Sequence, residues 1–167
     1  MTSHTLSVLV ENRASVLSQV AGMFSRRGFN IESLAVGTCE EPGMSRITIV
    51  VNGDDAVVEQ VMKQTNKIID VIKVSDLTER ESVERELALI KVAAETGAAR
   101  AEIMQIANIF RAQIVDVGTR TLVLQVAGDT DKIEALEKLL RQYGIKELVR
   151  TGKVALLRGS KTVKTSK

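Results

Sequence analysis

Apolar and polar positions change period early in the chain, and this change predicts a strand followed by a helix. Leu6–Val10 is mostly apolar and partly β-branched, which is typical of a buried strand. From Ser15 onward the apolar residues follow the helical period instead, at Leu17, Val20, Ala21 and Phe24. Gly28 is a natural residue just past a helix end. We therefore expect a strand, a helix and a second strand that begins at Phe29.

The remainder of the first half adds two strands and one helix. Gly37–Gly43, which holds the only proline, predicts a hairpin loop before a β-branched strand at Arg46–Val51. Asn52–Asp55 predicts a turn and a helix cap, and apolar residues at helical spacing follow it. Ile68–Val74 supplies a fourth strand. The resulting order of strand, helix, strand, strand, helix and strand is the ferredoxin-like pattern.

The second half repeats this order after a polar boundary at Asp76–Glu84. Gly97 predicts a break between the first strand and the first helix of this half. The predicted strands are Leu87–Ala93, Ile114–Val117, Thr121–Val126, Ile145–Val149 and an edge strand at Val154–Leu157. The predicted fold is α+β, with two consecutive ferredoxin-like βαββαβ domains at residues 1–77 and 78–158. Residues 159–167 are predicted to be a basic flexible tail.

Each predicted sheet carries its two helices on one face, which leaves the other face of the sheet uncovered. Such faces and the sheet edges need cover, because a small domain rarely buries enough apolar surface alone. Strand pairing between two copies would extend a sheet and create an interface. The pattern therefore predicts a dimer or a larger assembly, with two-fold symmetry as the default.

Composition narrows the class of protein. The 167 residues carry a net charge of only +2, which argues against nucleic acid as a partner. The single cysteine, Cys39, cannot form an internal disulfide and fits a reducing compartment. No apolar run approaches the length of a membrane span, and no signal peptide is visible. We expect a cytoplasmic protein with no membrane partner.

The sequence shows little that could support catalysis. His4 is the only histidine, so a histidine-based triad has no candidate base elsewhere in the chain. There is no phosphate-binding glycine loop and no cluster with metal-ligand spacing. We therefore predict no catalytic residue and no metal site.

Two alternatives to a binding module stay open at this stage. A small acylphosphatase-like enzyme would use an arginine and an asparagine, for which Arg13 and Asn30 are candidates. A nucleic-acid-binding protein of the same fold would need aromatic residues on its sheet, and only 2% of the chain is aromatic.

The loop before the first helix is the best candidate for a binding site. Glu11–Ala14 is polar and leads into a helix N-terminus, where backbone N–H groups lack partners and attract carboxylates or phosphates. The amide of Asn12 can both donate and accept hydrogen bonds. The simpler interpretation is that Asn12 only caps the helix and Asn30 only starts a strand.

Four ordered segments carry a resemblance to a known family. The stretch Leu6–Val36 resembles an ACT domain, the small amino-acid-sensing module. The run Arg27–Leu34 looks like the small regulatory subunit of acetohydroxyacid synthase, also called acetolactate synthase. Three later segments are similar to the same family in the same order: Asp70–Val74, Val83–Leu87 and Phe110–Val117.

The resemblance implies a non-catalytic regulatory subunit in branched-chain amino-acid biosynthesis. The partner would be a catalytic subunit that carries thiamine diphosphate, Mg²⁺ and FAD, while this chain would carry no cofactor. This chain would activate that subunit and confer feedback inhibition by valine or a related amino acid. An ACT-type sensor of another enzyme is the alternative within this class.

The resemblance also implies where the effector binds, between the ACT domains of a homodimer. The N–H groups of Ser15, Val16 and Leu17 and the side chain of Asn12 would hold its charged groups. Asn30 and Ile31 would close the site from the other chain. The implied effector-binding set is Asn12, Ala14, Ser15, Val16, Leu17, Asn30 and Ile31.

One position departs from the family pattern. Relatives usually carry glycine at the position of Ser15, often after proline at the position of Ala14. A glycine lets a carboxylate approach the backbone without meeting a Cβ atom. We expect the bulk of Ser15 to weaken valine binding and feedback inhibition.

Overall fold

The computed structural model describes residues 2–163 and divides into two compact units. The first unit contains the chain up to Glu84 together with the segment from Lys153 onward, and the second unit is Arg85–Gly152. The second unit is therefore an insertion within the first. The predicted domain boundaries differ from these units, because residues 78–84 and 153–158 belong to the first unit.

The first unit has the predicted βαββαβ order. Its four-stranded antiparallel sheet has the strand order β2-β3-β1-β4, so β1 and β3 are central and β2 and β4 are edges. The elements are β1 (Thr2–Glu11), α1 (Val16–Arg26), β2 (Ile31–Thr38), β3 (Met44–Gly53), α2 (Asp55–Thr65) and β4 (Val71–Asp76).

The second unit repeats this topology. Its main sheet has the order β6-β7-β5-β8, which matches the first sheet position by position. The elements are β5 (Ser82–Ala93), α3 (Gly97–Ile109), β6 (Gln113–Val117), β7 (Thr121–Gly128), α4 (Thr130–Leu140), the 3₁₀ helix η1 (Arg141–Tyr143) and β8 (Ile145–Arg150). The first three residues of β5 belong to the first unit. β9 (Val154–Leu157) follows and pairs with β5. The predicted α+β fold of two ferredoxin-like repeats is confirmed.

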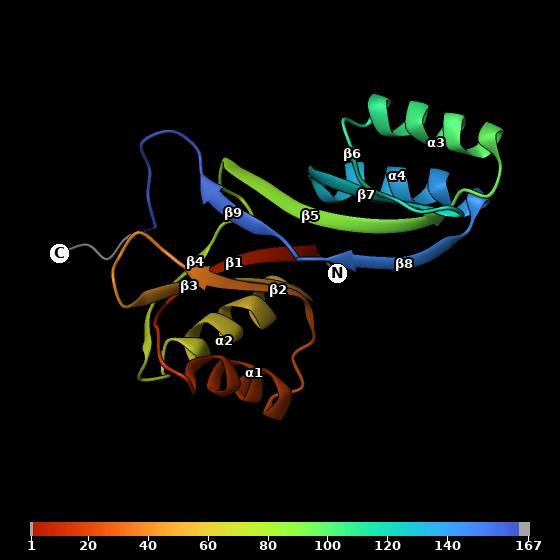
Figure 1. Cartoon of the computed structure of the whole chain (residues 1–167). Coiled ribbons are helices and arrows are strands. Elements are labelled where there is room, and N and C mark those ends of the chain that lie inside the picture. The colour runs from red at the N-terminus through yellow and green to blue at the C-terminus, as the bar shows by residue number, and fades with distance from the viewer. Residues whose placement is uncertain (1, 164–167) are drawn as a thin grey trace. The chain divides into compact units, whose positions relative to one another are not determined.

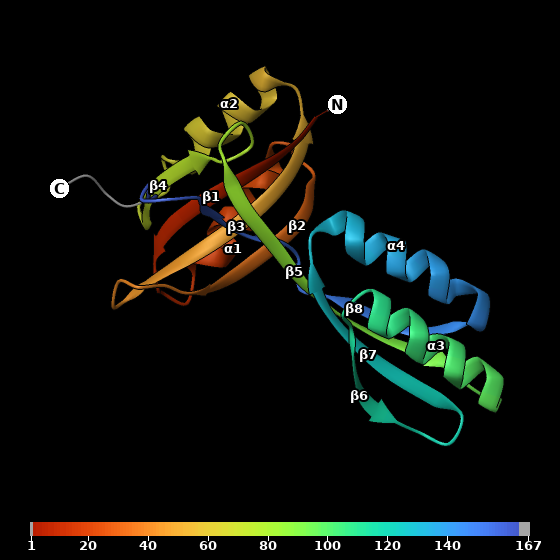
Figure 2. The same cartoon turned by 90° about the horizontal axis from the view of Figure 1, so that it is seen from above.

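The core of each unit lies between its sheet and its two helices. In the first unit α1 and α2 cover one face of the sheet (Figure 1), and every second residue of β1 points toward them. In the second unit α3 and α4 cover the sheet (Figure 2) in the same way. The innermost side chains of that second core are aliphatic: Ala88, Ile90, Val92, Ile103, Leu122, Leu124, Val126, Ile133, Leu136 and Leu140.

Several predicted boundaries differ from the structure, among them the starts of β2, β5 and α3. β2 begins at Ile31 rather than Phe29, because Gly28 turns the chain with φ +70° and the Phe29 N–H still bonds the Phe24 carbonyl at 3.0 Å. β5 begins at Ser82, ahead of the predicted start. Gly97 is the first residue of α3, and Thr96 caps this helix by accepting from the N–H of Ala99.

The face of the first sheet opposite its helices is covered, which corrects the prediction that it would be open. β9 lies on that side of the sheet (Figure 1). The small polar residues on this face are almost fully buried: Thr5, Ser7, Thr48 and Ser75. Leu77, Ala155 and Val163 form a separate buried cluster there, with Leu157 packed against it. Residues 153–163, which follow the second unit along the chain, therefore cover the sheet of the first unit. We call them the covering segment.

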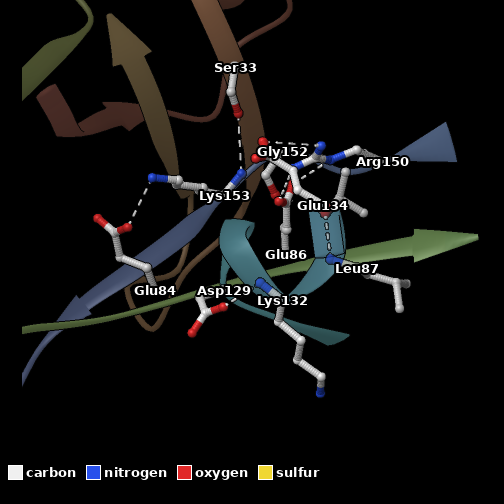
Figure 3. Close-up of polar contacts among 11 residues, drawn as sticks. Ser33, Glu84, Glu86, Leu87, Asp129, Lys132, Glu134, Arg150, Gly152 and Lys153 are labelled. Atoms are coloured by element: carbon white, nitrogen blue, oxygen red, sulfur yellow. Dashed lines mark hydrogen bonds and ion pairs between the residues drawn. The ribbon is translucent and has the colours of Figure 1, made fainter. Parts of the chain in front are cut away.

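Polar contacts fix the ends of this covering segment. The Lys153 N–H donates to Ser33 Oγ at 3.2 Å, and Lys153 Nζ pairs with Glu84 at 3.1 Å (Figure 3). The Arg158 N–H bonds the Glu81 carbonyl at 2.9 Å. Val163, inside the predicted flexible tail, is 6% exposed, and residues 164–167 of that tail lie outside the described residues.

An ion pair joins β5 and β8 in the second unit. The guanidinium of Arg150 donates to both carboxylate oxygens of the buried Glu86, and Glu134 lies 3.9 Å away (Figure 3). The hydrogen bond to Glu86 raises the pKa of Arg150. Removing either partner would leave a desolvated charge, so the pair holds β5 to β8.

Candidate functional site

The loop between β1 and α1 is anchored at its first residues. The Asn12 N–H donates to the Gly43 carbonyl at 2.8 Å, and the Arg13 N–H donates to the Glu11 carbonyl at 2.9 Å. The side chain of Asn12 is exposed and has no hydrogen bond to any of residues 2–163. Its amide group therefore points outward with all of its donors and acceptors available.

Helix α1 begins without a side-chain cap. Ser15 has φ −97° and ψ −8°, a helical conformation, and its hydroxyl makes no capping bond within the described chain. The N–H groups of Ser15, Leu17 and Ser18 have no acceptor among residues 2–163. This terminus therefore presents free donors and the positive end of the helix dipole, which together favour an anion.

Val16 differs from the other residues predicted to donate. Its N–H bonds the Arg13 carbonyl at 3.3 Å, and its side chain is buried in the core. Ala14, Ser15 and Leu17 are exposed. Ser18 supplies a free N–H that sequence reasoning missed, although the residue follows Leu17 in the first helical turn.

A set of charged and amide side chains surrounds the loop. The Arg13 guanidinium lies 2.7 Å from Glu11 Oε2 and 3.7 Å from Asp70 Oδ1, and the Asp70 side chain is mostly buried. Gln19 Nε2 donates to Ser15 Oγ at 3.1 Å and lies 3.4 Å from Asp70 Oδ2. Sequence reasoning missed Gln19 and Asp70. The four-residue spacing from Ser15 to Gln19 and the position of Asp70 beside the end of β1 were the available signals.

Asn30 and Ile31 lie at the other end of α1. Ile31 pairs with Val51 near the end of β3, whereas Asn12 lies beside Gly43 near the start of β3. An eleven-residue helix separates the two places, a distance of about 16 Å. One copy of the chain therefore does not bring Asn30 together with Asn12.

The same separation bears on the acylphosphatase alternative. Arg13 belongs to the loop before α1, and Asn30 follows its last turn. The two side chains cannot contact one phosphate within one copy.

His4 and Cys39 are the only histidine and the only cysteine of the sequence. His4 is buried, with Nδ1 3.5 Å from Asp76 Oδ2 and Nε2 3.9 Å from Asp55 Oδ1. Cys39 is a free thiol. Within residues 2–163, no group of three His, Cys, Asp or Glu side chains is placed to hold a metal ion. In the same residues, no helix has the length and apolar character needed to cross a membrane.

Comparison with known families gives two matches that follow one another along the chain. Residues 6–73 match a family described as the AHAS small subunit-like ACT domain. Residues 85–159 match a family described as the small subunit of acetolactate synthase.

Individual relatives match over almost the whole chain. A probable acetolactate synthase small subunit of Archaeoglobus fulgidus is 61% identical, over 95% of this chain and 98% of the relative. The acetolactate synthase small subunit of Mycolicibacterium smegmatis is 49% identical, over 99% and 96%. The crystal structure of the acetolactate synthase small subunit of Thermotoga maritima superposes with a TM-score of 0.88 at 42% identity, over 95% of this chain and 99% of that one.

Proposed function

Because this chain belongs to the family of acetolactate synthase small subunits, we propose that it makes the catalytic subunit responsive to a branched-chain amino acid. It activates that subunit and transmits feedback inhibition, with valine as the effector. The chain itself performs no catalytic step. Its place is the synthesis of valine, leucine and isoleucine.

The uncapped start of α1 is the observation that carries this proposal. The free N–H groups of Ser15, Leu17 and Ser18 suit the carboxylate of an amino acid. The exposed amide of Asn12 suits a second polar group of the ligand, and the exposed side chain of Leu17 offers apolar surface to an aliphatic one. Ala14 and Val16 belong to the same turn.

The site is completed by a second copy of the chain. Asn30 and Ile31 are too far from Asn12 to act on the same ligand in one copy, so they serve the site of the partner subunit. β2 is an edge strand of the first sheet, which allows pairing between copies through the ACT domains. A homodimer with two shared sites follows.

The catalytic partner supplies the chemistry of the holoenzyme. Thiamine diphosphate, Mg²⁺ and FAD belong to that subunit. This chain acts by linkage, because an effector shifts the complex only as far as its affinity differs between two states of the complex.

Reconstitution tests the proposal. Purified chain is added to an acetolactate synthase catalytic subunit, and acetolactate formation is measured with and without valine, leucine or isoleucine. Turnover should rise on addition of the chain and fall again with one of the amino acids. The proposed function would be refuted if adding the chain left the turnover of the catalytic subunit unchanged, or if the chain alone formed acetolactate.

A further inference from the structure

The start of α1 differs from the starts of α2, α3 and α4 in its capping. Each of those helices is preceded by a residue in extended conformation whose side chain accepts from the N–H three residues later. These caps are Asp54 to Val57, Thr96 to Ala99 and Asp129 to Lys132. Ser15, a strong capping residue by type, does not do this, because its ψ of −8° keeps the backbone helical.

The side chain of Gln19 contacts the Ser15 hydroxyl. The Gln19 side-chain nitrogen donates to Ser15 Oγ at 3.1 Å. The Gln19 backbone N–H donates to the Ser15 carbonyl at 3.0 Å, a bond that the carbonyls of the three other capping residues also accept, so the side-chain contact is what sets Ser15 apart. The Ser18 hydroxyl donates to the same carbonyl at 2.9 Å. Ser15 thus accepts hydrogen bonds at both its hydroxyl and its carbonyl oxygen, and none of these three bonds involves the free N–H groups of the first turn.

A mostly buried carboxylate orients the amide of Gln19. The amide nitrogen carries two hydrogens, and the second one faces Asp70 Oδ2 at 3.4 Å. Asp70 belongs to the turn before β4, and its backbone carbonyl also accepts from the Glu11 N–H at 2.8 Å. The position of the Gln19 side chain is therefore set by a group outside α1.

We propose that Gln19 is a positioning residue for the effector site: it keeps the Ser15 hydroxyl off the N–H groups of α1 and so leaves them free for the effector carboxylate. This inference rests on the proposed function. Without Gln19, Ser15 would rotate to the extended conformation seen at Asp54, Thr96 and Asp129. Its hydroxyl would then accept from the Ser18 N–H and compete with the ligand.

A double-mutant cycle on the full-length chain tests this role. Valine affinity is measured by titration calorimetry for wild type, Gln19→Leu, Ser15→Ala and the double variant. In the wild-type background, Gln19→Leu should weaken valine binding about fivefold, which corresponds to the energy of one N-cap interaction. In the Ser15→Ala background, Gln19→Leu should have no effect, because no hydroxyl is left to cap the helix. Gln105→Leu, the same change at an exposed position of α3, is the matched control. An equal loss from Gln19→Leu in both backgrounds would overturn the proposal.

Amide hydrogen exchange in the free chain separates this inference from the proposed function. The Ser18 N–H should exchange more slowly in Gln19→Leu than in wild type, and the slowing should vanish when Ser15 is also alanine. If the exchange of the Ser18 N–H slows as expected but the wild-type chain does not bind valine, the proposed effector is refuted and the role of Gln19 is supported. Unchanged Ser18 exchange in Gln19→Leu would refute the role of Gln19, whether or not valine binds.

Discussion

At the scale of single residues, the account depends on which polar groups at the start of α1 are free. The side-chain amide of Asn12 is exposed, and the backbone N–H of this residue is bonded to the Gly43 carbonyl. The Leu17 and Ser18 N–H groups stay free because the Ser15 hydroxyl does not cap the helix. These two residues therefore give the most direct single-residue tests.

Asn12→Ala should raise the valine concentration needed for half inhibition. Leaving one polar partner on the ligand unpaired costs about 1–3 kcal/mol, which corresponds to roughly tenfold or more in that concentration. The measurement is inhibition of the reconstituted enzyme, with Asn108→Ala, an exposed asparagine of α3, as the matched control. Inhibition at the wild-type concentration would show that Asn12 does not touch the effector.

Ser15→Gly should tighten valine binding, since only glycine removes the Cβ atom beside the carboxylate. The φ of −97° at Ser15 is ordinary for any residue, so the gain would come from space and not from backbone conformation. Calorimetry compares Ser15→Gly with Ser15→Ala, which retains Cβ. Equal affinities for the two variants would mean that Cβ does not hinder the ligand.

Lys91 and Glu147 give a test of surface electrostatics away from the site. The hydrogen bond from Lys91, 2.8 Å long, lowers the pKa of Glu147. Because the folded-state pKa is below the unfolded one, the pair's contribution to stability is present above the unfolded pKa and is lost as pH falls through the folded pKa. Lys91→Met should raise the pKa of Glu147 in a carboxyl NMR titration, while Lys63→Met should raise only that of Glu59.

At the scale of elements, the covering segment that includes β9 is the feature that the sequence did not reveal. Its strand was predicted at the correct residues, Val154–Leu157, but its place was not. Alternation indicates only that Ala155 and Leu157 share a face; it does not say which sheet that face meets. The burial of Ser7 and Thr48 is likewise invisible in the sequence, where small polar residues indicate a solvent-facing side.

Val163→Asp should destabilise the first unit. Val163 is buried against Leu77 and Ala155, and losing that burial costs about 2–3 kcal/mol, with a further cost for a charge placed there. Val154→Asp is the matched control, since Val154 is 53% exposed on the other face of β9. Urea denaturation of the full chain measures both, and equal stabilities would contradict the packing of the covering segment.

At the scale of the whole molecule, the repeated βαββαβ order was predictable because apolar periodicity records which face of each element is buried. The insertion of the second unit within the first was not, since it depends on where the chain returns after Gly152. The site was predictable only in part. The free N–H donors follow from the loop-to-helix pattern. The hydrogen bond from the Val16 N–H to the Arg13 carbonyl, and the contacts of Gln19 and Asp70, depend on tertiary geometry.

The separation of Asn12 from Asn30 leads to the central claim, that each effector site is shared between two copies of the chain. Asn12→Ala and Asn30→Ala should each weaken valine binding roughly tenfold or more when measured alone. In a mixed dimer, one site would join the intact Asn12 of one chain to the intact Asn30 of the other, and the second site would carry both changes.

Titration calorimetry on an equilibrated equal mixture of the two variants tests this claim most directly. Random exchange makes about half of the dimers mixed, and each mixed dimer restores one of its two sites. Tight valine binding should therefore return at about a quarter of the sites. A mixture that recovers no tight binding would contradict the account, because it would mean that Asn12 and Asn30 serve one site within a single chain, or no common site.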